Sequence, residues 1–211
     1  NEIEYHIDEK DTGNKFYQKE LTNSTTVTNR FEVPNETVQV EAVKVWNDNN
    51  NESQKRPTNI KLQIKAKGAV VEEYEVNDTN EWKHTFTLPK YDSLGDEIEY
   101  SVDENFVSEF YVESIVGNIV TNTFTVPADK VTIVGTKVWE DLENFANKRD
   151  ENVTLQLIGD GEVVAEQEVS DDNNWSYSFE VPKYDSLGNE IEYHIDERDT
   201  NNKFYKKELT N

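Results

Sequence analysis

A lysine, a glutamate and an asparagine occupy positions where the alternation of β-strands calls for apolar side chains. Because alternate strand residues share a face, Lys44 is expected to face the same side as Ala42. By the same rule, Glu104 follows Val102, and Asn122 stands between apolar residues of its own segment. The pattern therefore predicts three inward polar side chains that could meet in one core.

Three such buried groups need compensation, because removing one partner of a buried charge pair costs about 3–5 kcal/mol. One interpretation is a salt bridge with an amide partner. The other is a reaction, in which desolvation lowers the lysine pKa and raises the glutamate pKa. The neutral amine of Lys44 then attacks the side-chain carbon of Asn122, with Glu104 as proton carrier, and ammonia leaves. The alternation leaves both interpretations open, and the second is a single self-processing event that does not make the chain an enzyme.

The elements that position these residues recur along the chain. The phrase at residues 1–5 returns at 96–100 and again at 189–193, at spacings of about 95 and 93 residues. Lys44-Val-Trp46 likewise returns as Lys137-Val-Trp139. A period of this length is one whole domain.

The phase of the repeat predicts three parts. Residues 1–35 are the C-terminal part of a first repeat, residues 36–127 are a complete repeat, and residues 128–211 are a repeat without its last strand. Boundaries fall near Pro34 and Pro127, where proline ends strand pairing. The linkers are short and not rich in Gly or Ser, so tandem modules in a rod are expected.

The complete repeat is predicted to be all-β. Its segments alternate apolar and polar residues, are rich in Val, Ile, Thr, Tyr and Phe, and are separated by Asn-, Asp- and Gly-containing turns. Seven short strands in one such repeat indicate an immunoglobulin-like β-sandwich. The expected strands are 38–46, 59–67, 70–76, 82–88, 97–104, 109–115 and 118–126.

Composition excludes several classes of partner and site. The chain has 44 acidic and 21 basic residues, a net charge of −23, which argues against nucleic acid and anionic membrane surfaces. Without cysteine it has neither disulfides nor thiolate metal sites, and we expect no metal and no cofactor. No apolar run approaches a membrane span, and the absence of methionine predicts an interior piece of a longer chain.

Four motifs, which match in order and spacing along the repeats, resemble the collagen-adhesin B-type repeat (Cna B-type domain) of Gram-positive surface proteins. They are Thr136-Lys-Val-Trp139, Pro89-Lys-Tyr-Asp92, Ile98-Glu-Tyr-Ser-Val-Asp-Glu104 and Val120-Thr-Asn-Thr-Phe124. The resemblance covers essentially the whole chain. It implies an inverse immunoglobulin-like sandwich that serves as a stalk or pilin module on the bacterial cell wall. It also implies an internal isopeptide bond between a first-strand lysine and a last-strand asparagine, promoted by an acidic residue.

Carried over to this sequence, the resemblance implies a bond between Lys44 and Asn122, promoted by Glu104. The other two parts hold incomplete sets: Lys137 and Glu197 match in the third, and Glu9 and Asn29 in the first. One bond is therefore the most that one chain can form within its own repeats.

The incomplete ends allow two interpretations. Residues 24–34 of one molecule could complete the third repeat of another, joining Asn29 to Lys137 head to tail, because an open sheet edge accepts an added strand. Alternatively, the sequence is a segment of a longer natural chain that continues each repeat.

Three functions compete. The sequence favours a structural spacer that holds an adhesive tip away from the cell wall, because the repeats are similar and no loop stands out. The alternative is a host-ligand-binding module that uses an exposed sandwich face, and a hydrolytic enzyme would need a further repeated acid or base. Trp82 and Trp175 are predicted to pack in cores rather than stack on sugars. Residues 47–51 are predicted to form a turn rather than a calcium site.

Overall fold

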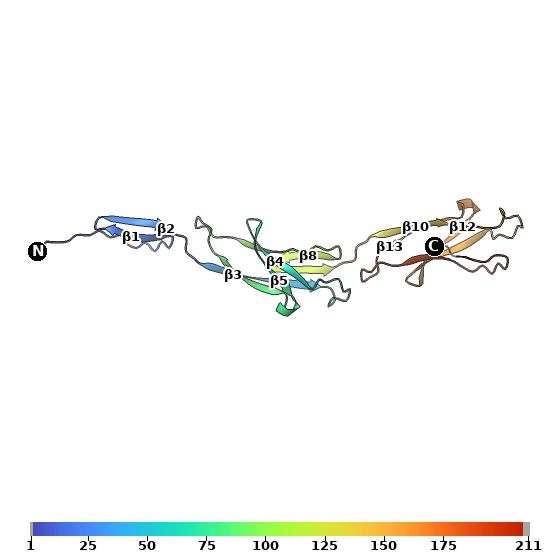
Figure 1. The fold of residues 1–211 in the computed structure, drawn as a ribbon, viewed down its shortest axis with the longest axis horizontal. Coiled ribbons are helices and arrows are strands. Elements are labelled where there is room, and N and C mark those ends of the chain that lie inside the picture. Colours follow the sequence, from blue (N-terminus) through green and yellow to red (C-terminus); the bar gives the residue numbers. More distant parts are fainter. Residues whose placement is uncertain (1, 209–211) are drawn as a thin grey trace. The chain divides into compact units, whose positions relative to one another are not determined.

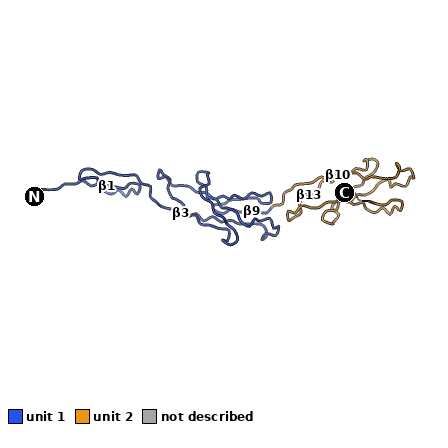
Figure 2. Tube along the Cα trace, in the orientation of Figure 1, with its two compact units in different colours: residues 1–124 blue, residues 125–211 orange. Residues whose placement is uncertain are grey.

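The computed structural model describes residues 2–208. Asn1 and residues 209–211, which the repeat phase assigns to the first and third parts, lie outside the described residues. The chain divides into two compact units, Asn1–Phe124 and Thr125–Asn211 (Figure 2). No helix within residues 2–208 has the length and apolar character needed to cross a membrane.

Unit 1 begins with a hairpin and continues as a two-sheet sandwich. The hairpin joins β1 (Tyr17–Asn23) to β2 (Thr26–Phe31). The sandwich strands β3, β4, β5 and β8 lie together in Figure 1, and the sheets have the orders β6-β3-β9-β8 and β5-β4-β7. Its elements are β3 (Thr37–Asn47), β4 (Asn59–Ala66), β5 (Ala69–Asn77), the 3-10 turn η1 (Asp78–Asn80), β6 (Lys83–Pro89), β7 (Tyr100–Glu104), β8 (Tyr111–Val116) and β9 (Ile119–Phe124).

The seven strands expected for the complete repeat are confirmed, but four begin later than expected and the last ends earlier, at Phe124. The strands expected from residues 109 and 118 begin at Tyr111 and Ile119. The strand expected from residue 97 begins at Tyr100, because Glu97 forms only an isolated bridge with Tyr91. The strand expected from residue 82 begins at Lys83, because Trp82 has a left-handed φ of 56° that extended pairing does not allow.

The first and last strands of the sandwich are neighbours. β3 pairs with β6 in antiparallel fashion and with β9 in parallel fashion, with Trp46 in register with Asn122. A parallel pair requires a long connection, here the chain through β4 to β8. The register therefore depends on the whole repeat and not on a local turn.

One apolar core fills the space between the two sheets of unit 1. Trp82 packs against it, as predicted. At about 25 cal/mol per Å² of apolar surface, burial of this set is the main stabilising contribution to the sandwich. Its buried members are Ala42, Ile60, Leu62, Ile64, Val76, Phe86, Leu88, Val102 and Val120.

Unit 2 repeats most of this arrangement. Its sheets have the orders β10-β13 and β12-β11-β14, and Trp175 is buried in one of its two core clusters, as predicted. Within the described residues β10 pairs with β13 alone, whereas its counterpart β3 has two partners. The elements are β10 (Lys130–Thr136), β11 (Asn152–Gly159), β12 (Glu162–Ser170), η2 (Asp171–Asn173), β13 (Ser176–Pro182) and β14 (Tyr193–Glu197).

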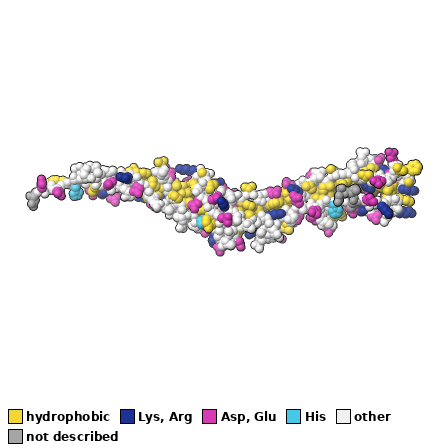
Figure 3. Space-filling view, in the orientation of Figure 1, with side chains coloured by type: hydrophobic (Ala, Val, Ile, Leu, Met, Phe, Trp, Pro, Cys, Tyr) yellow, Lys and Arg dark blue, Asp and Glu magenta, His cyan; other side chains and the backbone are white. Residues whose placement is uncertain are grey.

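The acidic excess lies on the surface. Asp and Glu side chains are scattered over the visible face of both units, with Lys and Arg between them (Figure 3). Several form exposed ion pairs, such as Lys130 with Glu180 and Lys183 with Glu190. Exposed pairs of this kind contribute little to stability, so the charge mainly keeps the exterior solvated.

Candidate cross-linking site

The structure brings Lys44, Glu104 and Asn122 together inside unit 1. Lys44 Nζ lies 3.1 Å from Glu104 Oε2, and both side chains are fully buried. Asn122 Nδ2 donates a hydrogen bond to Glu104 Oε1 at 2.7 Å. One carboxylate thus contacts both the amine and the amide that the proposed chemistry would join.

Three strands from two sheets position this triad. Lys44 on β3 and Asn122 on β9 come from neighbouring parallel strands of one sheet. Glu104 ends β7 in the opposite sheet, where it pairs with Leu62 of β4. The carboxylate therefore reaches the lysine and the asparagine across the sandwich, where water is excluded.

Aromatic rings surround the amine. Lys44 Nζ lies 4.5 Å from the centre of the Trp46 ring. Trp46 is in turn held edge to face by Trp82, Phe106 and Tyr111, at centroid distances of 5.2 to 5.5 Å. A cation over an indole face is stabilised, but the apolar wall also removes the hydration that an ammonium needs.

Burial lowers the pKa of Lys44, and the nearby negative charge of Glu104 only partly opposes this shift. A lower pKa means that the neutral, nucleophilic amine is easier to form at physiological pH than in a solvated lysine.

A second carboxylate borders the site. Glu113 on β8 stands directly opposite Asn122 in the β8–β9 register. Burial raises the pKa of Glu113, and the negative charge of Glu104 raises it further. The sequence reasoning overlooked Glu113, because it occupies an exposed position of β8 and the alternation does not mark it as a neighbour of Asn122.

Three buried atoms of the triad form no hydrogen bond within the described residues: Lys44 Nζ and Glu104 Oε2, which contact each other as an ion pair, and Asn122 Oδ1. Asn122 Oδ1 is buried and accepts no hydrogen bond within the described part of the chain. An unsatisfied buried oxygen costs about 1–3 kcal/mol. If Glu104 took the proton of Lys44, a half-turn of the Asn122 amide would place Oδ1 against the new Glu104 hydroxyl, which is the contact that makes the amide carbon electrophilic.

The incomplete sets are also brought together, in more open surroundings. Lys137 Nζ lies 3.4 Å from Glu197 Oε2, and the two side chains are 19% and 17% exposed. Asn29 Nδ2 donates to Glu9 Oε2 at 2.8 Å in an exposed position. Each set thus repeats one of the two contacts that Glu104 makes in the central repeat.

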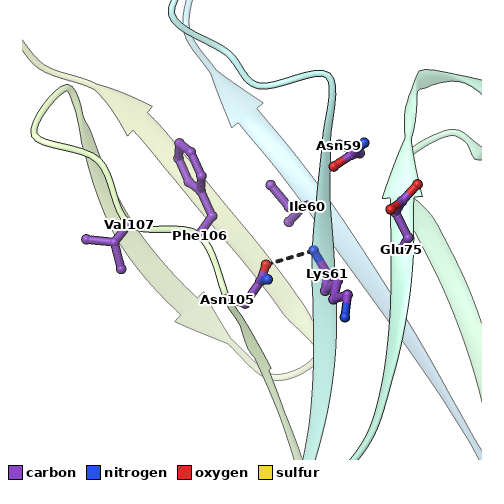
Figure 4. A pocket seen from close by; sticks show the side chains of 7 residues that line it. All are labelled: Asn59, Ile60, Lys61, Glu75, Asn105, Phe106 and Val107. Atoms are coloured by element: carbon purple, nitrogen blue, oxygen red, sulfur yellow. Dashed lines mark hydrogen bonds between the residues drawn. The ribbon is translucent and has the colours of Figure 1, made fainter.

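Two pockets of unit 1 lie near the end of β7. The larger, about 310 Å³, is lined by polar groups such as Lys61 and Asn105, which share a hydrogen bond, and includes no triad member (Figure 4). The smaller, about 250 Å³, is lined by Tyr111, Glu113 and Asn122 among others and reaches the triad. Within residues 2–208 no cluster of three or more His, Asp or Glu side chains could hold a metal ion.

The turn at residues 47–51 contains a second buried acid. Asp48 is 5% exposed and is bound by Arg56 from the following loop. The sequence reasoning treated this segment only as a turn. The available signal was the return of an Asp, an Asn and an Arg at the same spacing in the third repeat, at Asp141, Asn144 and Arg149.

Comparison with known proteins gives the family. Residues 40–123 and 133–211 each match the Cna protein B-type domain. The chain is 37% identical over 202 residues to a collagen adhesin of Staphylococcus aureus, which covers 92% of this chain and 16% of that protein.

Solved structures of the same organism's collagen-binding surface protein are also similar. A single B repeat unit (B1) is 31% identical, with 83% of this chain and 92% of that one covered and a TM-score of 0.41. A two-repeat structure (B1B2) is 31% identical, with 87% and 49% covered and a TM-score of 0.49. With two matched copies spanning most of its length, the chain belongs to the Cna protein B-type domain family.

Proposed function

We propose that the central repeat cross-links itself by an isopeptide bond between Lys44 Nζ and Asn122 Cγ. The observation that supports this is the fully buried contact of Glu104 with both groups, at 3.1 and 2.7 Å. A salt bridge alone would gain little from such burial, because desolvation of the two charges offsets their attraction.

The proposed reaction starts with transfer of one proton from the Lys44 ammonium to Glu104. The neutral amine attacks Asn122 Cγ, while the Glu104 hydroxyl hydrogen-bonds the amide oxygen, and a new C–N bond forms. Protons of the attacking nitrogen pass through Glu104 to Nδ2, the Cγ–Nδ2 bond breaks, and ammonia leaves. It carries away the proton first held by lysine, as ammonium, and Glu104 is again a carboxylate.

The fold supplies proximity and an exit. Holding the reacting groups side by side can account for about 7–11 kcal/mol of barrier. The smaller pocket beside Asn122 gives the released ammonia a path past Glu113.

We propose further that the chain is a spacer segment of a bacterial cell-surface adhesin, located outside the cell. This rests on the family and on the similar collagen adhesin, of which the chain spans 16%. Because β3 and β9 are parallel neighbours, a bond between them makes a covalent path that enters and leaves the repeat without crossing the rest of the fold. Pulling force would then bypass the sheets.

Intact mass under denaturing conditions tests the bond. The parent chain is expected to be lighter than its sequence by one ammonia, and Glu104→Ala is expected to keep its sequence mass, because the proton carrier is lost. Glu197→Ala, the same change in unit 2, serves as the control and should leave the loss of ammonia intact. If the parent and Glu104→Ala each have the mass of their own sequence, only a buried salt bridge remains.

We also propose that the β1–β2 hairpin of one molecule can complete unit 2 of another. β2 carries Asn29, and within residues 2–208 β10 has no counterpart of the second partner that β3 has in β9. Lys137 and Glu197 already lie together beside that edge and need only an asparagine.

A mixture of two variants tests this strand exchange. Asn29→Ala keeps Lys137 but lacks the amide, and Lys137→Ala keeps the amide but lacks the amine. Each alone should stay free of intermolecular bonds. The mixture should form a covalent dimer that grows no further and that is lighter by one ammonia than the sum of the two variant monomers, each of which has already lost one ammonia from its central repeat. A mixture that remains monomeric by size-exclusion chromatography at high concentration excludes the exchange.

A further inference from the structure

A buried carboxylate next to the triad is held from several sides. The Asp48 side chain is fully buried. Arg56 Nε donates to Asp48 Oδ2 at 2.8 Å, the Tyr111 hydroxyl donates to the same oxygen at 2.9 Å, and Asn51 N donates to Oδ1 at 3.0 Å. We call Asp48, Arg56 and Tyr111 the carboxylate clamp.

The surroundings of the clamp favour an ionised Asp48 and a neutral Tyr111. Burial alone would raise the pKa of Asp48, but the hydrogen bonds from Arg56 and Asn51 outweigh it and hold this pKa below its ordinary value. Burial and the neighbouring carboxylate raise the pKa of Tyr111 to about 12, so the phenol remains a donor at neutral pH. Charge-assisted hydrogen bonds of this kind are stronger than neutral ones.

The clamp is joined to the reacting lysine through one ring. The Arg56 guanidinium lies 5.6 Å from the centre of the Trp46 ring, and the Tyr111 ring meets the indole edge to face at 5.2 Å. Lys44 Nζ lies 4.5 Å from the same indole. Fixing Trp46 therefore fixes the apolar wall beside the amine.

The same device is present in unit 2. Arg149 Nε donates to Asp141 Oδ2 at 2.9 Å, and the Tyr205 hydroxyl donates to it at 2.8 Å. Lys137 Nζ lies 4.3 Å from the Trp139 ring, as Lys44 does from Trp46. In unit 2 β10 has no parallel neighbour within the described residues, so the clamp and the covered lysine do not require the last strand.

The backbone of the clamp loop keeps an unfavourable shape in both units. Residues 49–51 have φ of 51° to 62°, and residues 142–144 have φ of 52° to 63°. Asparagine tolerates this left-handed region, but Leu142 and Glu143 adopt it at a cost of roughly 1–2 kcal/mol each. The turn directs the backbone N–H of Asn51 and of Asn144 at the clamp carboxylate, which explains why the shape survives a change of sequence.

We infer that Asp48, Arg56 and Tyr111 are positioning residues for the cross-linking reaction, which hold Trp46 over Lys44 and keep water from its amine before the last strand docks. The inference rests on the proposed function. The carboxylates whose charge opposes the lowered pKa of Lys44 are Glu104 on β7 and Glu113 on β8, and the clamp reaches the amine through the Trp46 ring.

The test compares Arg56→Gln with the parent during cell-free synthesis, quenched in denaturant at set times and followed by intact mass. Loss of ammonia should be roughly tenfold to a hundredfold slower in Arg56→Gln, because small misplacements of reacting groups have effects of this size. The pH at which the rate of ammonia loss rises should also be higher in Arg56→Gln, because a better hydrated lysine has a higher pKa and stays protonated to a higher pH. Arg149→Gln makes the same change in unit 2 and should leave the rate at the parent value.

Two further variants apply if Arg56→Gln does not fold or if the parent forms no bond. Tyr111→Phe removes one hydroxyl and should slow the reaction less, which tests the clamp if Arg56→Gln does not fold. In an Asn122→Ala background, where no bond can form, NMR titration of Lys44 should show a higher pKa when Arg56→Gln is added. Should the parent lose no ammonia, the proposed function fails, while this titration still tests the clamp. A folded Arg56→Gln with the parent's rate, pH profile and lysine pKa would overturn the inference.

Discussion

Lys44→Ala is expected to unfold the central repeat under conditions where the parent stays folded. It removes the cross-link, which by analogy with other covalent links closing a loop of roughly 80 residues contributes about 4–5 kcal/mol. It also leaves Glu104 buried without its partner, at a cost of about 3–5 kcal/mol. The combined loss of roughly 7–10 kcal/mol is comparable to the whole stability of an ordinary domain, and denaturant titration would measure it.

Two controls separate these contributions. Asn122→Ala abolishes the bond but keeps the Lys44–Glu104 pair, so it should lose mainly the cross-link contribution. Lys137→Ala removes the matching lysine of unit 2, where both partners are partly exposed, and should shift the denaturation midpoint much less. If Lys44→Ala and Lys137→Ala destabilise the chain equally, neither the bond nor the burial has the effect assigned to it.

Phe86→Ala should have the second largest effect. Phe86 on β6 is completely buried and meets His84 edge to face at 4.7 Å. It stands opposite Val40 of β3, the strand that carries Lys44. Truncation of a buried phenylalanine leaves a cavity and costs about 3–5 kcal/mol, and calorimetry should show a lower unfolding temperature for the central repeat.

An exposed apolar residue gives the matched control for this cavity. Val107 is 94% exposed, so Val107→Ala should leave the unfolding temperature unchanged. Hydrogen exchange should also report faster opening of β3 and β6 peptides in Phe86→Ala, with those of unit 2 unaffected. A cost no larger than that of Val107→Ala would mean that the core relaxes around the missing ring.

The individual elements of the fold could be predicted because the sequence patterns are local. Strand alternation places Lys44 on the inward face, and the structure finds this side chain fully buried. The turns between strands are marked by Asn, Asp and Gly. The starts of β6 and β7 were predicted too early. In both places the side-chain pattern is that of a strand, but Trp82 belongs to a turn and Glu97 forms only an isolated bridge.

The site itself was only partly visible in the sequence. Alternation shows that Glu104 and Asn122 face inward, but not that one carboxylate contacts both groups. Glu113 and Arg56 were overlooked, because an acid on a strand and a base in a loop normally face solvent. Only their neighbours in space, Asn122 for one and Asp48 for the other, give them a role.

The sequence by itself determined the repeat, the strands and the inward polarity of three side chains, because these depend on residue type and on a period of two. The tertiary structure alone decided that β3 and β9 are parallel neighbours and that β7 reaches them across the sandwich. It also decided that the Asp48 clamp supports the ring beside Lys44. These contacts join residues far apart along the chain, and their geometry is fixed by the packing of the whole core rather than by any local preference.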